Sequence, residues 1–247
     1  MKLGVVGKGG VGKTTVAAQL SRAFARRGDR VIAIDTDSNP NLGLSLGLSM
    51  AAMEQVPVLP RSVIVGAGGT TSAAALIAEY GRPTPAGVTL LSAIRVSEAA
   101  AGCTCAGHAT VRSLLGDALA DQADVTVVDM EAGLEHLSRS GGTLAYADAL
   151  LVVMEPSRKS LLTAVRTKAL AEELAIPRVY GLGNKAQPDD VAFFQDAAAD
   201  HGLELAGVLA HDGRVAAADR AGTAVDGGPE LDGVIAVLER PMESPSE

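Results

Sequence analysis

The chain has 247 residues and a formal net charge of -8, and 47% of its residues are hydrophobic while only 2% are aromatic. This length favours one large α/β domain, residues 1–240, whose core is built from aliphatic side chains. An acidic chain gains nothing from polyanions, so nucleic acid and anionic membrane surfaces are not expected as partners. No signal peptide and no membrane-spanning apolar run is found, and the two cysteines are too close together for a useful disulfide, so a cytoplasmic protein is predicted.

Short apolar runs alternate with helical patterns along the whole chain. Residues 2–6 are predicted to be a buried strand, followed by a helix with Val16, Leu20 and Phe24 on one face and Gly28 at its end. Further buried strands are predicted at 30–34, 63–65, 88–94, 125–128, 149–154, 178–183 and 205–209. Further helices are predicted at 73–80, about 109–119, 161–174 and 231–240, whereas 46–60 are poorly patterned and 241–247 form a frayed tail. The alternation predicts a mostly parallel, twisted sheet covered by helices on both faces.

The most specific motif lies between the first strand and the first helix. It is Gly7-Lys8-Gly9-Gly10-Val11-Gly12-Lys13-Thr14-Thr15. Gly, four residues and then Gly-Lys-Thr is the P-loop pattern, in which backbone N–H groups surround phosphate oxygens. Lys13 is expected to neutralise the β- and γ-phosphates, and the Thr14 hydroxyl is expected to bind Mg²⁺. The predicted nucleotide-binding residues here are Gly9, Gly10, Val11, Gly12, Lys13, Thr14 and Thr15.

Lys8 adds a second lysine inside the variable part of this loop. With it, the motif resembles the deviant Walker A, or signature-lysine, family of P-loop ATPases, which includes MinD, ParA, the nitrogenase iron protein and the CooC-type nickel-insertion ATPases. The resemblance implies an ATP-promoted homodimer in which Lys8 crosses the interface to the partner's nucleotide. A second cation opposite the γ-phosphate would stabilise transition-state charge as an arginine finger does. The alternative is a solvated loop lysine.

Three carboxylates follow predicted strands. Asp35 and Asp37 come after the second strand, where they could hold Mg²⁺ or orient water, and the resemblance places Asp37 in switch I, next to the attacking water. The alternative is a pair of turn residues. Asp129 ends the 125–128 strand as a Walker B carboxylate should, and residues 130–135 occupy the place of switch II, with Gly133 able to move. The alternative for Asp129 is an ordinary strand-end residue.

Asn184 and Lys185 follow the 178–183 strand. A guanine-binding motif would have Asp two residues after the lysine, but Gln187 stands there. Asn offers both a donor and an acceptor to the adenine edge, so ATP is favoured over GTP and Asn184 is predicted to bind the base. The alternative is an Asn that merely begins a loop.

Cys103 and Cys105 lie two residues apart on a segment that is predicted to be a flexible, Gly-flanked loop. Two thiols so placed can bind one soft metal ion, Ni²⁺ or Zn²⁺, and a two-fold axis through the segment would supply four thiolates per dimer. His108 is a possible further ligand, although a His just before a helix is more often solvated or capping. The alternative for the pair is two small buried apolar residues.

The cysteine pair and the segment after Asp129 make the resemblance more specific within the signature-lysine family. Cys103-Thr104-Cys105 before a helix, and Asp129 to His136 at switch II, are similar to the CooC-type ATPases, which mature nickel enzymes such as carbon monoxide dehydrogenase. This implies ATP hydrolysis, a metal bound between two subunits and a client nickel enzyme. Two segments depart from the pattern: 50–86 is divergent and compact, and Ala210-His211-Asp212 replaces a Pro-containing loop on the adenine side.

Two other functions remain open at this point. A MinD/ParA-like positioning ATPase would need a basic amphipathic C-terminal helix or a DNA-binding surface, and the 231–240 helix is short and acidic. An iron–sulfur ATPase like the nitrogenase iron protein would need two well-separated cysteines in each chain, whereas this chain has only the adjacent pair.

Overall fold

A computed structural model describes residues 1–60, 72–95, 105–119, 121–132 and 143–241 of the chain. Its strands form one sheet in the order β3-β4-β2-β5-β1-β6-β7-β8, and every pair is parallel except β3 with β4. The strands are β1 (Lys2–Gly7), β2 (Val31–Asp35), β3 (Arg82–Pro83), β4 (Thr89–Ser92), β5 (Val125–Asp129), β6 (Ala149–Met154), β7 (Val179–Ala186) and β8 (Glu204–Ala210). The predicted mostly parallel α/β sheet is therefore confirmed.

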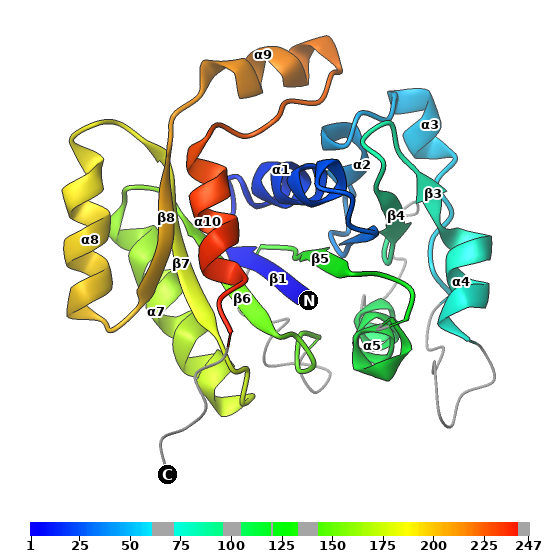
Figure 1. Ribbon diagram of the computed structural model, residues 1–247, viewed down its shortest axis with the longest axis horizontal. Coiled ribbons are helices and arrows are strands. Elements are labelled where there is room, and N and C mark those ends of the chain that lie inside the picture. Colours follow the sequence, from blue (N-terminus) through cyan, green and yellow to red (C-terminus); the bar gives the residue numbers. More distant parts are fainter. Residues whose placement is uncertain (61–71, 96–104, 120, 133–142, 242–247) are drawn as a thin grey trace.

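Helices cover both faces of this sheet (Figure 1). They are α1 (Lys13–Arg26), α2 (Leu42–Ser45), α3 (Met50–Glu54), α4 (Ala73–Tyr80), α5 (Cys105–Ser113) with the π-helical turn η1 (Leu114–Ala118), α7 (Arg158–Glu173), α8 (Asp190–Asp200), α9 (Gly213–Ala221) and α10 (Glu230–Leu238). None of the helices in the described ranges combines the length and apolar character needed to cross a membrane.

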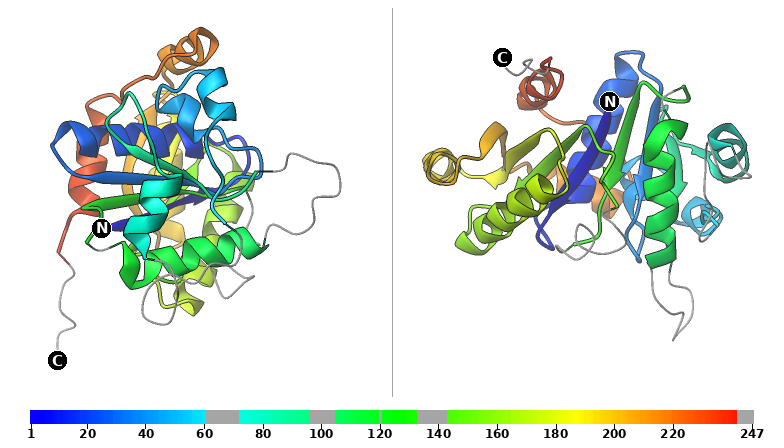
Figure 2. Two further views of the ribbon diagram at one scale, coloured as in Figure 1. Left: turned by 90° about the vertical axis from the view of Figure 1, so that its right-hand side faces the viewer. Right: turned by 90° about the horizontal axis from the view of Figure 1, so that it is seen from below.

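The strand residues alternate between two hydrophobic cores. Leu3 and Val5 of β1 pack with α1 and α10 on one face, whereas Val6 packs with α5, α7 and α8 on the other. Figure 2 shows the helices standing on both sides of the sheet. Because both faces are buried, the central strands are continuous apolar runs, which is the pattern expected of parallel sheets.

The structure corrects several of the element boundaries predicted from the sequence. The poorly patterned stretch 46–60 contains α3, and the short edge strand β3 was not anticipated. Helix α5 begins at Cys105, before the predicted start, and β7 continues past residue 183 to Ala186. The predicted strand at 63–65 and the tail at 242–247 lie outside the described residues.

Helix α5 begins early because a histidine takes part in its buried stripe. His108, Val111, Leu114 and Leu115 are all buried, and they follow one another at helical spacing. The sequence pattern, which counted only apolar residues, therefore started the helix too late.

The topology gathers the functional segments at one edge of the sheet. Strands β1, β2 and β5 are adjacent, and Asp129 pairs in register with both Val5 and Asp35. In open parallel sheets, ligands bind beyond the carboxyl ends of the strands. The loop after β1 and the carboxylates after β2 and β5 therefore meet at one place.

Candidate functional site

The loop between β1 and α1 has a backbone that only glycine adopts readily. Gly10 and Gly12 have φ angles of 83° and 96°, and Gly12 is the left-handed residue that precedes α1. A Cβ atom on Gly12 would lie 2.6 Å from the side-chain nitrogen of Asn184. The loop therefore has the tight form expected of a phosphate-binding loop, and β7 packs directly against it.

Lys13 is buried at the start of α1, and its amino group donates a hydrogen bond to the Lys8 carbonyl at 3.2 Å. Burial lowers its pKa, and the negative charges of Asp129, Asp37 and Glu131 partly oppose that shift. The predicted phosphate-binding lysine thus lies inside the loop and among the predicted carboxylates.

Asp35 and Asp129 are buried side by side on neighbouring strands. Asp35 accepts hydrogen bonds from the backbone N–H groups of Asp37, at 3.0 Å, and Leu42, at 2.9 Å. Burial, more than any neighbouring charge, raises the pKa of Asp35 to about 6. Burial and then the charge of Asp35 raise the pKa of Asp129 to about 8, and they outweigh the hydrogen bond that Asp129 accepts from the Thr14 hydroxyl, which lowers it.

One oxygen of Asp129, Oδ1, is buried without a hydrogen-bond partner among the described groups. A buried carboxylate oxygen of this kind is costly unless a cation or donor approaches it. Carboxylates beside a P-loop threonine are the hard oxygen ligands that Mg²⁺ prefers, either directly or through water. The residues present therefore fit a magnesium ion. Asp129 was predicted from its place at the end of a strand, and the unpaired oxygen is a second, structural reason for the same role.

Replacing Asp129 with asparagine should stabilise the metal-free protein more at pH 8 than at pH 5. A carboxyl whose folded pKa is raised from 3.8 to about 8 contributes stability below pH 3.8 that is lost as pH rises through 8. The variant has no such proton to lose, so its gain in unfolding free energy over the wild type should grow by roughly 3 to 4 kcal/mol between the two pH values. Urea unfolding in EDTA measures this.

The exposed Asp200→Asn change at the end of α8 is the matched control and should show no such pH difference. An Asp129→Asn gain that is equal at pH 5 and pH 8 would contradict the buried-carboxyl account.

The segments after β2 and β5 are tied together by side-chain hydrogen bonds. Thr36 donates to the Asp129 carbonyl at 2.8 Å, and Ser38 donates to Glu131 at 2.9 Å. The Asp37 carboxylate accepts from the Asn39 backbone N–H at 2.8 Å, which is the geometry of an Asx turn. Movement of either predicted switch would therefore act on the other, while the catalytic role of Asp37 stays a prediction. Gly133 lies outside the described residues.

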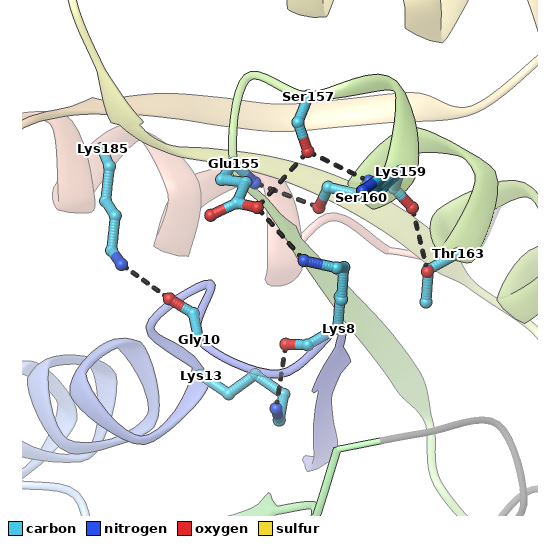
Figure 3. Close-up of polar contacts among 9 residues, drawn as sticks. All are labelled: Lys8, Gly10, Lys13, Glu155, Ser157, Lys159, Ser160, Thr163 and Lys185. Carbon is cyan, nitrogen blue, oxygen red and sulfur yellow. Dashed lines mark hydrogen bonds and ion pairs between the residues drawn. The ribbon is translucent and has the colours of Figure 1, made fainter.

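Lys8 lies on the same loop, but its amino group points toward Glu155 and away from that of Lys13 (Figure 3). The Lys8 amino group and the Glu155 carboxylate are 3.4 Å apart and both are partly exposed, so their ion pair is weak. Ser157 also donates to Glu155, at 3.3 Å. The contact of Lys8 with Glu155 in its own chain was not anticipated. Glu155 was missed, although its place directly after the 149–154 strand is a signal of the kind used for Asp129.

Asn184 was predicted to follow the 178–183 strand. That is wrong, because Asn184 lies within β7, which continues to Ala186 with a register shift after Gly183. The Asn184 amide donates to the Val11 carbonyl at 2.8 Å, and the Lys185 amino group donates to the Gly10 carbonyl at 2.6 Å. The contact of Lys185 was not anticipated. Asn184 therefore supports the phosphate loop, and its contact with a base stays a prediction.

A cleft of about 1050 Å³ opens beside these residues. Its walls come from the start of α1, the end of β7 and helix α9, and they include Thr14, Thr15, Asn184, His211 and Val215. The cleft runs from the phosphate loop to residues 210–212, where the adenine-side loop was expected. A nucleotide with its phosphates in the loop would place its base in this cleft.

The structure describes only part of the cysteine segment. Cys103 lies outside the described residues, and Cys105 begins helix α5 instead of lying in a loop, so that part of the prediction is wrong. His108 lies in the first turn of α5 and is only 3% exposed, so it is neither solvated nor ahead of the helix.

Comparison with known proteins supports the assignment of the loop after β1 to a nucleotide-binding domain. A family model described as the CobQ/CobB/MinD/ParA nucleotide binding domain matches residues 5–225. The chain belongs to this family. It is 37% identical to the carbon monoxide dehydrogenase accessory protein CooC of Rhodospirillum rubrum, over 90% of this chain and 88% of that protein. It is 35% identical to an uncharacterized ATP-binding protein of Methanocaldococcus jannaschii, over 87% of each chain.

Solved structures show the same fold. The MinD cell division protein of Aquifex aeolicus superposes with a TM-score of 0.70 at 19% identity, over 98% of both chains. MinD of Pyrococcus horikoshii, solved with Mg-ADP, gives 0.68 at 17% identity, over 97% of this chain and 96% of that one. The predicted fold class and the deviant Walker A assignment are confirmed, and the chain is an ATP-hydrolysing enzyme of this family.

Proposed function

We propose that this ATPase is a dimerising metallochaperone that helps to insert nickel into a metalloenzyme such as carbon monoxide dehydrogenase. The observation that carries the proposal is the 37% identity to CooC, named as a carbon monoxide dehydrogenase accessory protein, across 90% of the chain. The Cys103 and Cys105 pair supports it, because thiolates are suitable ligands for Ni²⁺ or Zn²⁺. A client enzyme and a second subunit are then the partners.

The nucleotide would lie with its phosphates in the loop and its base in the cleft. Residues 9–15 would supply backbone N–H groups and the Lys13 charge, with Thr14 and the carboxylates Asp35 and Asp129 around Mg²⁺. Mg²⁺ would shield the phosphate charge, and the Asp37 carboxylate would orient the attacking water. The Asn184 amide group donates to Val11, which leaves its carbonyl oxygen to accept from the exocyclic amine of adenine.

A MinD/ParA-like positioning ATPase is the alternative. The MinD structures share less than 25% identity with this chain and show only the common fold. Helix α10 spans nine residues, carries Glu230 and Asp232 in its first turn and has no basic residue in its last turn. A helix of that charge is poorly suited to anionic lipid or DNA, which favours the metallochaperone.

Replacing both Cys103 and Cys105 with serine tests the proposed function. The ATP-bound wild type should bind one Ni²⁺ per dimer, because two chains together provide the four ligands of a closed site. The double variant should bind ATP normally and lose the metal. The affinity of the wild type should fall as pH drops, because thiolates must lose protons to bind. Titration of Ni²⁺ into ATP-bound protein, with metal analysis of the isolated dimer, measures the stoichiometry.

Mg-ATP affinity of the double variant is the matched control for folding. One independent metal site per monomer, or metal binding that survives the double substitution, would exclude the shared cysteine site.

A further inference from the structure

The end of strand β7 holds a lysine in a conformation that lysine rarely adopts. Lys185 has a φ angle of 58°, in the left-handed region, and it lies where the register of β7 against β8 shifts between Gly183 and Ala186. A non-glycine residue there costs on the order of 1 kcal/mol, so surrounding contacts must maintain it. The strain points to a contact that needs the Lys185 side chain at this position.

That contact is with the phosphate loop. The Lys185 amino group donates to the Gly10 carbonyl at 2.6 Å, and the neighbouring Asn184 amide donates to the Val11 carbonyl at 2.8 Å. Figure 3 shows Lys185 approaching Gly10 from β7, apart from the amino groups of Lys8 and Lys13. Two successive residues of β7 thus hold two successive carbonyls of the loop.

The orientation of these carbonyls decides where the loop donors point. The Gly10 carbonyl belongs to the same planar peptide as the Val11 N–H, and the Val11 carbonyl belongs to the same peptide as the Gly12 N–H. A phosphate loop must direct such N–H groups inward, so their carbonyls must point outward. A cation that holds the Gly10 carbonyl from outside therefore keeps the Val11 N–H turned to the phosphate side before any phosphate arrives.

We propose that Lys185 is a positioning residue that pre-forms the phosphate loop, so that it sets the affinity for the phosphate groups of the nucleotide and not the rate of hydrolysis. The inference rests on the proposed phosphate site and adds a residue that the loop motif does not contain. Lys185 acts through the Gly10 peptide and needs no contact with the nucleotide itself.

Replacing Lys185 with methionine tests this, because methionine keeps an unbranched side chain and removes the charged donor. Dissociation constants for Mg-ADP and for Mg-pyrophosphate should both rise about tenfold, since a charge-assisted hydrogen bond that orders the loop is lost. The hydrolysis rate at saturating ATP should stay within about twofold of wild type. Lys185→Arg should restore both affinities to within about threefold, because a guanidinium can also donate to the carbonyl. Lys168→Met, on the outer face of α7, is the matched control.

Lys185→Gly separates positioning from folding. Glycine adopts a φ of 58° without strain, so this variant should unfold at no lower urea concentration than Lys185→Met while binding Mg-ADP equally weakly. Wild-type affinity of either variant for pyrophosphate would overturn the proposal. A fall in the saturated rate with unchanged affinities would also overturn it, because Lys185 would then act in the chemistry.

Lys13→Ala distinguishes this inference from the site on which it rests. If Lys13→Ala binds pyrophosphate normally, the phosphates lie elsewhere and the proposed site itself is wrong. If Lys13→Ala fails to bind while Lys185→Met binds normally, only the role of Lys185 is wrong.

Discussion

Alanine in place of Lys13 should abolish nucleotide binding, with an affinity for Mg-ADP at least about 10³-fold weaker than that of the wild type. Lys13 is buried at the start of α1, with its amino group inside the loop at the Lys8 carbonyl. Its charge faces Asp129, Asp37 and Glu131, so the variant would present phosphate with carboxylates and no nearby buried cation. Titration with a fluorescent ADP analogue measures the loss.

Lys168→Ala is the control for this substitution, because it removes a lysine that pairs with Glu172 on the same helix, away from the phosphate loop. Thermal unfolding of both variants shows whether the fold is retained. A Lys13→Ala protein that is folded and binds Mg-ADP with wild-type affinity would contradict the placement of the phosphates in this loop.

Alanine in place of Lys8 should leave Mg-ATP binding within about threefold of wild type and lower the hydrolysis rate by about 10³-fold. Binding is retained because the Lys8 amino group points to Glu155, at 3.4 Å, and not into its own phosphate loop. Hydrolysis is lost because the lysine is proposed to stabilise γ-phosphate charge in the partner subunit. A phosphate-release assay at saturating ATP measures the rate.

Mixing the two variants tests whether the lysine acts across the interface. A Lys8→Ala subunit binds ATP, and a Lys13→Ala subunit still carries Lys8, so together they assemble one complete site. With random pairing of equal amounts, roughly a quarter of the wild-type rate should return. The Lys8→Ala variant alone at the wild-type rate would contradict a role for Lys8 in hydrolysis.

Much of the fold follows from the sequence because its signals are local. An unbroken apolar run such as 149–154 must be buried on both faces, and that strand is confirmed as β6 with the same bounds. Helix α4 likewise matches the predicted 73–80, with the Ser72 side chain accepting from Ala75 at its start. The edge strand β3 was missed because its two residues, which pair with β4 in a short hairpin, are too few to show a pattern.

The sequence alone determined the chemistry of the loop after β1 and the type of protein. The spacing of Lys8, Gly12, Lys13 and Thr14 is a local pattern, because these residues act through one continuous turn of backbone. Strand-end carboxylates were predictable for the same reason, since the ends of adjacent parallel strands must meet at one edge of the sheet.

Only the tertiary structure decided which distant residues support that loop. Glu155 beside Lys8, and Lys185 at the Gly10 carbonyl, are separated from their partners by 147 and 175 residues, respectively. The order of the strands puts β6 next to β1 and β7 next to β6, and Lys185 lies at the register shift of β7 with its amino group at the loop. Neither the strand order nor a shift of one residue leaves a local pattern, because both arise from packing of the whole sheet.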